Sequence, residues 1–68
     1  MMKNEELKPE MRVLVDVDGS LKPGKVIDSV RKINKNTGEV IGILGWMVAT
    51  EPSGLHRQVT ADKIHPRD

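Results

Sequence analysis

The 68-residue sequence contains no cysteine, no phenylalanine and no tyrosine, and Trp46 is its one aromatic residue. Without cysteine there is neither a disulfide framework nor a thiolate metal site, so the crosslinks that usually stabilise a small domain are missing. One ring cannot build the aromatic cages that bind methylated lysine, or the aromatic surfaces that bind proline-rich peptides and single-stranded nucleic acids. Trp46 is therefore expected either in the core or as an interface anchor.

Long apolar segments and a charge of one sign are also absent. The first ten residues are polar and charged, so we expect neither a signal peptide nor a membrane span and interpret the chain as a cytoplasmic protein without a membrane partner. The 11 basic residues nearly balance the 10 acidic ones, which gives a net charge of +1. This balance does not favour strong, sequence-independent binding of nucleic acid.

The pattern that is present is one of short strands separated by turns. Residues 11–17 alternate between apolar and polar side chains, which predicts a strand. Residues 18–24 contain Asp-Gly-Ser and Pro-Gly and predict a polar loop, and residues 34–38 predict a hairpin tip. Two glycines in the apolar run 40–48 predict a bent or bulged strand, and residues 61–66 predict a single helical turn followed by a closing strand.

These features predict an all-β domain with five strands. The opening VLVDVDGSLKPGKVIDSV resembles the first strand, polar loop and Lys-Val-Ile strand of the Src-homology-3-like small barrels, which include Tudor and KOW-type modules. The closing VTADKIHP resembles their one-turn helix and last strand. The resemblance implies a Src-homology-3-like barrel domain over residues 11–68, preceded by a flexible N-terminal tail over residues 1–10. It addresses the fold rather than the function, because such barrels serve many functions.

A second resemblance is to the plasmid-borne type II dihydrofolate reductases, which are tetrameric barrels of similar length. GWMVATEPSG and HRQVTADKI resemble their Gly-Trp step, their Pro-Gly turn and their last two strands. In that family a Val-Gln-Ile-Tyr stretch lines the active pore, and the stretch here is Arg57-Gln58-Val59-Thr60, so Gln58 alone carries over. The resemblance implies a homo-oligomer, structural or reductase-like, with Trp46 and Gln58 as candidate interface residues.

Motifs that suggest catalysis have simpler interpretations. Asp16-Val17-Asp18-Gly19 resembles the first motif of haloacid-dehalogenase-type phosphatases, but that chemistry needs Mg²⁺ and a much larger doubly wound domain. We interpret it as a strand that ends in an Asp-Gly turn. His56 and His65 lack a third strong ligand and are expected to be surface histidines. The sequence therefore predicts no catalytic residue, metal site or cofactor.

Basic residues gather in the middle of the chain, where Asp28 is the one acid between positions 22 and 35. The cluster consists of Lys22, Lys25, Arg31, Lys32 and Lys35. It is either a solvated hairpin or a contact surface for nucleic-acid phosphates or an acidic protein. We expect a small non-enzymatic binding or assembly module. The alternative is a homo-oligomeric barrel in which the apolar strand 43–48 pairs with a copy of itself.

Overall fold

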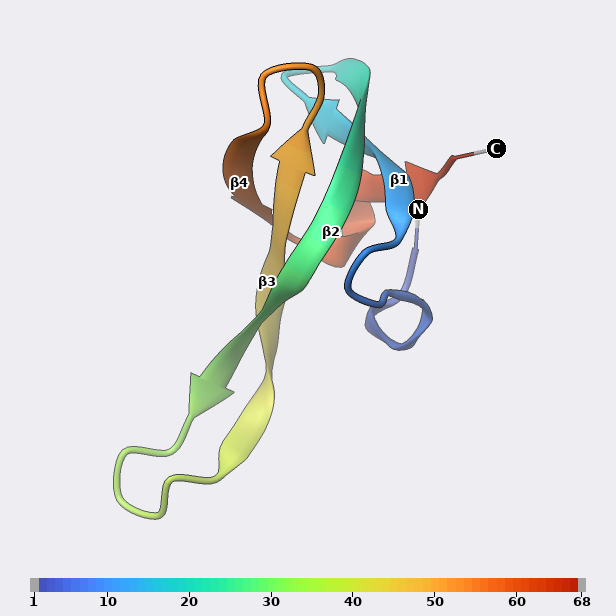
Figure 1. The fold of residues 1–68 in the computed structure, drawn as a ribbon. Coiled ribbons are helices and arrows are strands. Elements are labelled where there is room, and N and C mark those ends of the chain that lie inside the picture. The colour runs from blue at the N-terminus through green and yellow to red at the C-terminus, as the bar shows by residue number, and fades with distance from the viewer. Residues whose placement is uncertain (1, 68) are drawn as a thin grey trace.

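The computed structural model describes residues 2–67 as one antiparallel sheet of five strands. The strands are β1 (Arg12–Val17), β2 (Ser20–Ile33), β3 (Val40–Thr50), β4 (Leu55–Val59) and β5 (Ile64–Pro66), with two single 3-10 turns, η1 (Asn4–Glu6) and η2 (Ala61–Lys63). Their order across the sheet is β4-β3-β2-β1-β5 (Figure 1). The prediction of an all-β chain with one helical turn before the last strand is confirmed. Within residues 2–67, β4 and β5 form the two edges and the sheet does not close.

A two-residue turn, Asp18-Gly19, connects β1 to β2. Both residues have a left-handed backbone, with φ of 53° and 85°, as a type I′ hairpin turn requires. The Asp16 Oδ1 atom accepts a hydrogen bond of 2.9 Å from the Gly19 amide. The Asp-x-Asp-Gly sequence is thus a strand running into a turn, as predicted. The polar loop predicted over residues 18–24 is wrong, because β2 already begins at Ser20.

Gly24 lies inside β2 because neighbouring chain segments approach it closely. A Cβ atom at this position would lie 2.9 Å from the Ala49 carbonyl oxygen and 3.1 Å from Val48 Cγ1. Gly24 pairs with Val13 of β1 and with Thr50 of β3. Glycine is therefore required here by the close approach of neighbouring strands and does not mark a loop. This explains why the Pro-Gly pair predicts a turn at a position where the structure has a strand.

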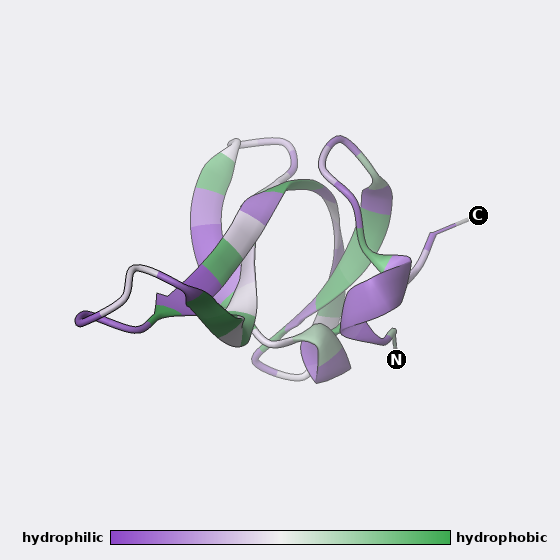
Figure 2. Ribbon diagram, turned by 90° about the horizontal axis from the view of Figure 1, so that it is seen from below, coloured by the Kyte–Doolittle hydropathy of each residue, from purple (hydrophilic) through white to green (hydrophobic). Residues whose placement is uncertain are grey.

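The core lies between the curled strands of the sheet (Figure 2). Its buried apolar side chains come from the residue after η1 and from every strand except β4. They are Leu7, Val13, Val15, Val26, Trp46, Val48 and Ile64. The alternation predicted for the first strand is present, since Val13 and Val15 are fully buried and Leu14 between them is half-buried. Trp46, at 4% exposure, is a core residue.

Residues 2–10 pack against this core, where the sequence predicts a flexible tail. Leu7 is only 5% exposed and belongs to the buried cluster. The Trp46 Nε1 group donates a hydrogen bond of 3.0 Å to Asn4 Oδ1, and the Met2 amide donates one of 2.9 Å to the Ile64 carbonyl. An isolated apolar residue such as Leu7 gives no periodic signal, so its burial could not be predicted from the sequence.

The far halves of β2 and β3 leave the rest of the molecule as a two-stranded ribbon (Figure 1). Residues 31–44 are named the arm; they make the molecule elongated, with extents of 39 × 22 × 22 Å. A turn at residues 35–37, followed by Gly38 with φ of 77°, confirms the predicted hairpin tip. Shifts of register leave Ile41 and Leu44 as extra residues on β3, which confirms the predicted bulging. No helix within residues 2–67 has the length and apolar character needed to cross a membrane.

Candidate binding surface: the arm

Large apolar side chains are exposed along the arm. They are Ile33 at 55%, Val40 at 53%, Ile41 at 59%, Ile43 at 39% and Leu44 at 54% of their full exposure. Outside the arm, the large apolar residues that are comparably exposed among residues 2–67 are Leu21 and Leu55. Single exposed apolar residues are ordinary on protein surfaces, whereas a contiguous group marks a contact surface. The arm is such a group.

The strand register separates the two sides of the arm. Residues directly opposite each other in an antiparallel pair have side chains on the same side. Ile33 pairs with Val40 and Arg31 with Ile43, so these four share one side. Lys32 pairs with Gly42 and lies on the other side. Among the paired residues of the arm, this side is therefore mainly apolar, and Arg31 is its one charged residue.

The apolar side of the arm continues the core-facing side of the sheet. Ser29 pairs with the buried Trp46, and alternation along β2 places Arg31 and Ile33 on that same side. The core itself ends at Trp46, because no residue of the arm is buried. The arm thus presents a core-like side with nothing packed on it within the described chain.

The basic residues of the arm are free of carboxylate partners among residues 2–67, where the ion pairs are Lys25–Glu10 at 3.0 Å and Arg67–Glu51 at 3.2 Å. Arg31 Nε donates a hydrogen bond of 3.1 Å to Ser29 Oγ, which directs the guanidinium along β2. Lys32 and Lys35 are exposed. Glu39 is the one acid within the arm, so the arm carries an excess of positive charge.

The five basic residues singled out from the sequence do not form one surface. Lys22 pairs with Val15 at the opposite end of β2, and Lys25 is held by Glu10. A strand rises about 3.3 Å per residue, so Lys22 and Lys32 are separated by up to about 33 Å. The structure brings Arg31, Lys32 and Lys35 together on the arm and leaves Lys22 and Lys25 apart from them.

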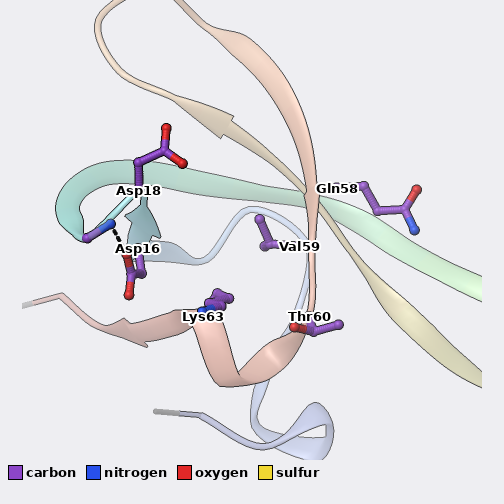
Figure 3. A pocket seen from close by; sticks show the side chains of 7 residues that line it. Asp16, Asp18, Gln58, Val59, Thr60 and Lys63 are labelled. Atoms are coloured by element: carbon purple, nitrogen blue, oxygen red, sulfur yellow. Dashed lines mark hydrogen bonds between the residues drawn. The ribbon is translucent and has the colours of Figure 1, made fainter.

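Gln58 lies exposed on β4, at the rim of an open hollow of about 630 Å³ between the β1–β2 turn and the end of β4 with η2 (Figure 3). Asp16, Asp18 and Lys63 also line it. Figure 3 shows the two carboxylates pointing apart and Gln58 pointing away from both. Within residues 2–67, no three His, Asp or Glu side chains are placed to hold a metal ion together. The hollow therefore offers no convergent set of groups for catalysis.

Asp62, in η2 beside this hollow, is the carboxylate whose titration is clearly perturbed. Its pKa lies below the usual range, mainly because the Thr60 side chain hydrogen-bonds to its carboxylate. A general acid needs the opposite shift, since it must hold its proton near neutral pH. Asp62 is thus an exposed carboxylate whose pKa is shifted in the direction opposite to that of a general acid.

Comparison with models of protein families, with curated proteins and with solved structures finds no significant match for this chain. The function must therefore be argued from the surface itself. The arm is the feature in which exposed apolar side chains and unpaired cations occur together.

Proposed function

We propose that the chain is a small, non-enzymatic assembly module that binds a partner protein through the arm. The observation that supports this proposal is the group of five exposed apolar side chains on a ribbon with no packing partner in the described chain. Covering apolar surface contributes about 25 cal/mol per Å², so a partner that covers the arm gains substantial free energy. A protein surface can provide that cover.

The architecture of the arm also favours a docking role. A two-stranded hairpin by itself is only marginally stable in water, and stability normally requires a third strand or a packed face. The pairing of β1 with β2 ends at Arg12 and Lys25, and that of β4 with β3 ends at Val59 and Trp46. The arm lies beyond both limits and has neither kind of support within residues 2–67. A bound partner would supply it.

The chemistry of the arm favours a protein partner with an acidic rim. Arg31, Lys32 and Lys35 complement carboxylates, and the apolar side chains between them match an apolar patch. Contact with nucleic-acid phosphates uses cations and has no need for exposed isoleucines. The one aromatic ring, Trp46, is buried and cannot stack on bases. The mixed arm therefore fits an acidic protein better than RNA or DNA.

The rest of the domain serves as the scaffold of the arm. Its strand order, with a one-turn helix before the last strand, resembles the layout of the Src-homology-3-like barrels, and we include that fold in the proposal. A cytoplasmic location is also part of the proposal. Sites on such small β folds vary between proteins, so the arm and not the fold carries the functional argument.

Self-association is the alternative. The sequence suggests the strand 43–48 for pairing with a copy of itself, but from Trp46 onwards β3 is already paired with β2 and β4. Its remaining free edge lies in the arm. Two arms placed together would bring the cations of both copies close, which is unfavourable. Sedimentation at micromolar concentration measures the solution mass and decides whether the chain self-associates.

A photocrosslinking amino acid at position 41, the most exposed of the arm's apolar residues, tests the proposal. The protein crosslinked in a native extract is identified and purified, and its affinity is then measured by calorimetry. Ile33→Ser with Ile41→Ser should weaken binding at least tenfold, because burying each isoleucine contributes about 1.5–3 kcal/mol. Leu21→Ser with Leu55→Ser is the matched control, since these residues are exposed to 55% and 54% at other places on the surface. The control should bind as the parent does.

Two results would contradict the proposal. The first is loss of partner binding in the Leu21 and Leu55 control with full binding in the arm variant. The second is tight binding of duplex DNA or single-stranded RNA that falls with salt by about 0.7–0.9 log units per phosphate contact. Replacing Arg31, Lys32 and Lys35 by Glu would abolish that binding, whereas the two serine substitutions would not. This pattern would make the arm a nucleic-acid surface.

A further inference from the structure

We propose that the arm captures an extended, acidic and apolar segment of its partner as an additional strand along the free edge of β2, residues 28–33. The inference rests on the proposed function and specifies how the arm would bind. A partner strand there would turn the two-stranded ribbon into a three-stranded sheet, which is the smallest sheet that is stable by itself when one side is covered. The position of this edge follows from the hydrogen bonds around it.

Neighbouring chain covers the outer edge of β2 only as far as Val26. The Val26 amide donates a hydrogen bond of 2.8 Å to the Met11 carbonyl, and the Val26 carbonyl accepts one of 2.8 Å from the Glu10 amide. From Asp28 to Ile33, no strand within residues 2–67 pairs with β2 on the side away from β3. These six residues form an open edge about 20 Å long.

The hydrogen bonds of the arm show which amides face this open edge. The Asn34 amide donates a hydrogen bond of 2.8 Å across the arm to the Glu39 carbonyl. Successive amides of a strand point to opposite edges, so the Lys32 amide also faces β3, whereas the Arg31 and Ile33 amides face outward. Arg31 and Ile33 thus offer donors that a partner's carbonyl oxygens can accept.

Ser29 independently supports this assignment. Alternation from Arg31 places the Ser29 amide on the open edge, and it donates a hydrogen bond of 2.8 Å to its neighbour's carboxylate, Asp28 Oδ1, instead of to β3. The Asp28 side chain therefore satisfies the first outward donor of the edge. The two donors that follow are the ones left for a partner strand.

The edge of β3 in the arm is less suitable for an added strand. Ile41 and Leu44 are extra residues in its pairing with β2, and such bulges break the regular spacing of donors and acceptors. Over the same length of the arm, β2 has no extra residue. An added strand therefore finds a regular template on β2 and an irregular one on β3.

Side chains on the β2 edge define the chemistry of the added segment. Arg31 and Lys32 lie on opposite sides of the ribbon, so carboxylates on either side of a partner strand meet a cation. Ile33, on the side of Arg31, favours an apolar neighbour. Antiparallel pairing of this edge with that of a second copy would bring like charges together, which favours an acidic segment over self-pairing.

Blocked eight-residue peptides that alternate Glu and Val are suitable probes. Amide hydrogen exchange followed by NMR should slow at least tenfold at Arg31 and Ile33 when this peptide is added. A matched peptide that alternates Lys and Val should have no effect. Alternate amides of the added strand point to opposite edges, and only one edge faces β2. N-methylation of every second peptide amide should therefore abolish the protection when it blocks the edge that faces β2. N-methylation of the remaining amides should preserve the protection. Absence of protection with the Glu peptide, or equal binding of the two methylated forms, would overturn strand addition.

Position 33 gives the corresponding test on the protein. Ile33→Ala and Ile33→Pro both remove the isoleucine side chain, but only proline also removes the outward amide. Proline should weaken the Glu peptide and the purified partner at least fivefold more than alanine, while unchanged Trp46 fluorescence shows that the domain is folded. Equal weakening would overturn strand addition and leave docking by side chains intact. A different result would overturn the proposed function itself: the partner binds both position-33 variants as it binds the parent, but does not bind the control with Leu21→Ser and Leu55→Ser.

Discussion

Trp46 Nε1 donates a hydrogen bond of 3.0 Å to Asn4 Oδ1, and this contact ties the middle of β3 to η1 across 42 positions of sequence. The indole is 4% exposed, so its N–H group has little access to water and depends on a protein acceptor. The first turn of the chain is thereby fixed over the core. Since Trp46 is the only aromatic residue, its fluorescence reports on this contact without interference.

Replacing Asn4 by alanine should lower the free energy of unfolding by about 1 kcal/mol, because the indole N–H loses its acceptor. Urea unfolding followed by Trp46 fluorescence measures the change. Glu5→Ala alters an exposed neighbour in the same turn and should leave the midpoint nearly unchanged. Identical midpoints for the two variants would mean that the hydrogen bond does not contribute in solution.

Leu7→Ala tests whether the N-terminal segment belongs to the core. Leu7 is 5% exposed, and truncation of a buried leucine costs about 2–5 kcal/mol. We expect a large drop in melting temperature, or unfolding of this small domain. Lys8→Ala, which changes the exposed next residue, is the control. Equal melting of the two variants would support the flexible tail that the sequence predicts.

Gly45 and Gly42 form a matched pair of glycines on β3. A Cβ atom at Gly45 would lie 2.7 Å from the Val59 carbonyl oxygen, whereas at Gly42 nothing lies within 4 Å. Gly45→Ala should therefore cost about 1–3 kcal/mol by pushing β4 away from β3, and Gly42→Ala should be close to neutral. Thermal unfolding of both variants measures the difference. Equal stabilities would contradict a close approach of β4 to Gly45.

Local signals explain what could be predicted from the sequence. The hairpin tip follows from Asn34 and Gly38, residues that suit tight turns, and the bulges follow from glycines in an apolar run. Pro23-Gly24 carries the same local signal but lies within a strand, because Gly24 is required by the packing of Val48 and Ala49 around it. This requirement comes from contacts with other strands, so the residues next to Gly24 in the sequence do not reveal it.

The candidate surface was only partly accessible to sequence reasoning. Arg31, Lys32 and Lys35 were identified because charge clusters are visible in the sequence. The exposure of Ile41 and its apolar neighbours could not be predicted, because apolar residues are expected to be buried. Where the core ends depends on how far the strands extend, which the pattern does not indicate. β3 extends beyond the core, and the extra residue Leu44 shifts its alternation, so that Ile43 continues the side of Trp46 and Val48 but is not covered.

The lowered pKa of Asp62 predicts a small dependence of stability on pH. Its main cause is the hydrogen bond with the Thr60 side chain, and Lys63 contributes least. Because the folded pKa is below the unfolded value of about 4, the stabilisation is present above that value and is lost as the pH falls through the folded pKa. Thr60→Val should raise the pKa of Asp62, measured by NMR titration, more than Lys63→Ala does. A larger effect of Lys63 would reverse this assignment.

The arm should be dispensable for folding, which separates its role from that of the scaffold. Residues 33–41 are replaced by Asn-Gly, so that Lys32 and Gly42, which pair directly and whose backbone groups face each other, are joined by a two-residue hairpin turn. None of the buried apolar residues lies within the deleted segment. The free energy of unfolding should change by less than about 1 kcal/mol, as for surface changes in general, and Trp46 fluorescence should match the parent.

Binding should respond in the opposite way to this deletion. The shortened chain lacks Ile33, Val40 and Ile41, together with Lys35, so the purified partner should no longer bind detectably in calorimetry. A milder variant that replaces only the tip, residues 35–38, by Asn-Gly keeps the paired strands of the arm and should retain most of the affinity. If the shortened chain unfolds, the arm stabilises the domain and its exposed residues have a structural role. If it folds and binds as the parent does, the contact surface lies elsewhere on the sheet.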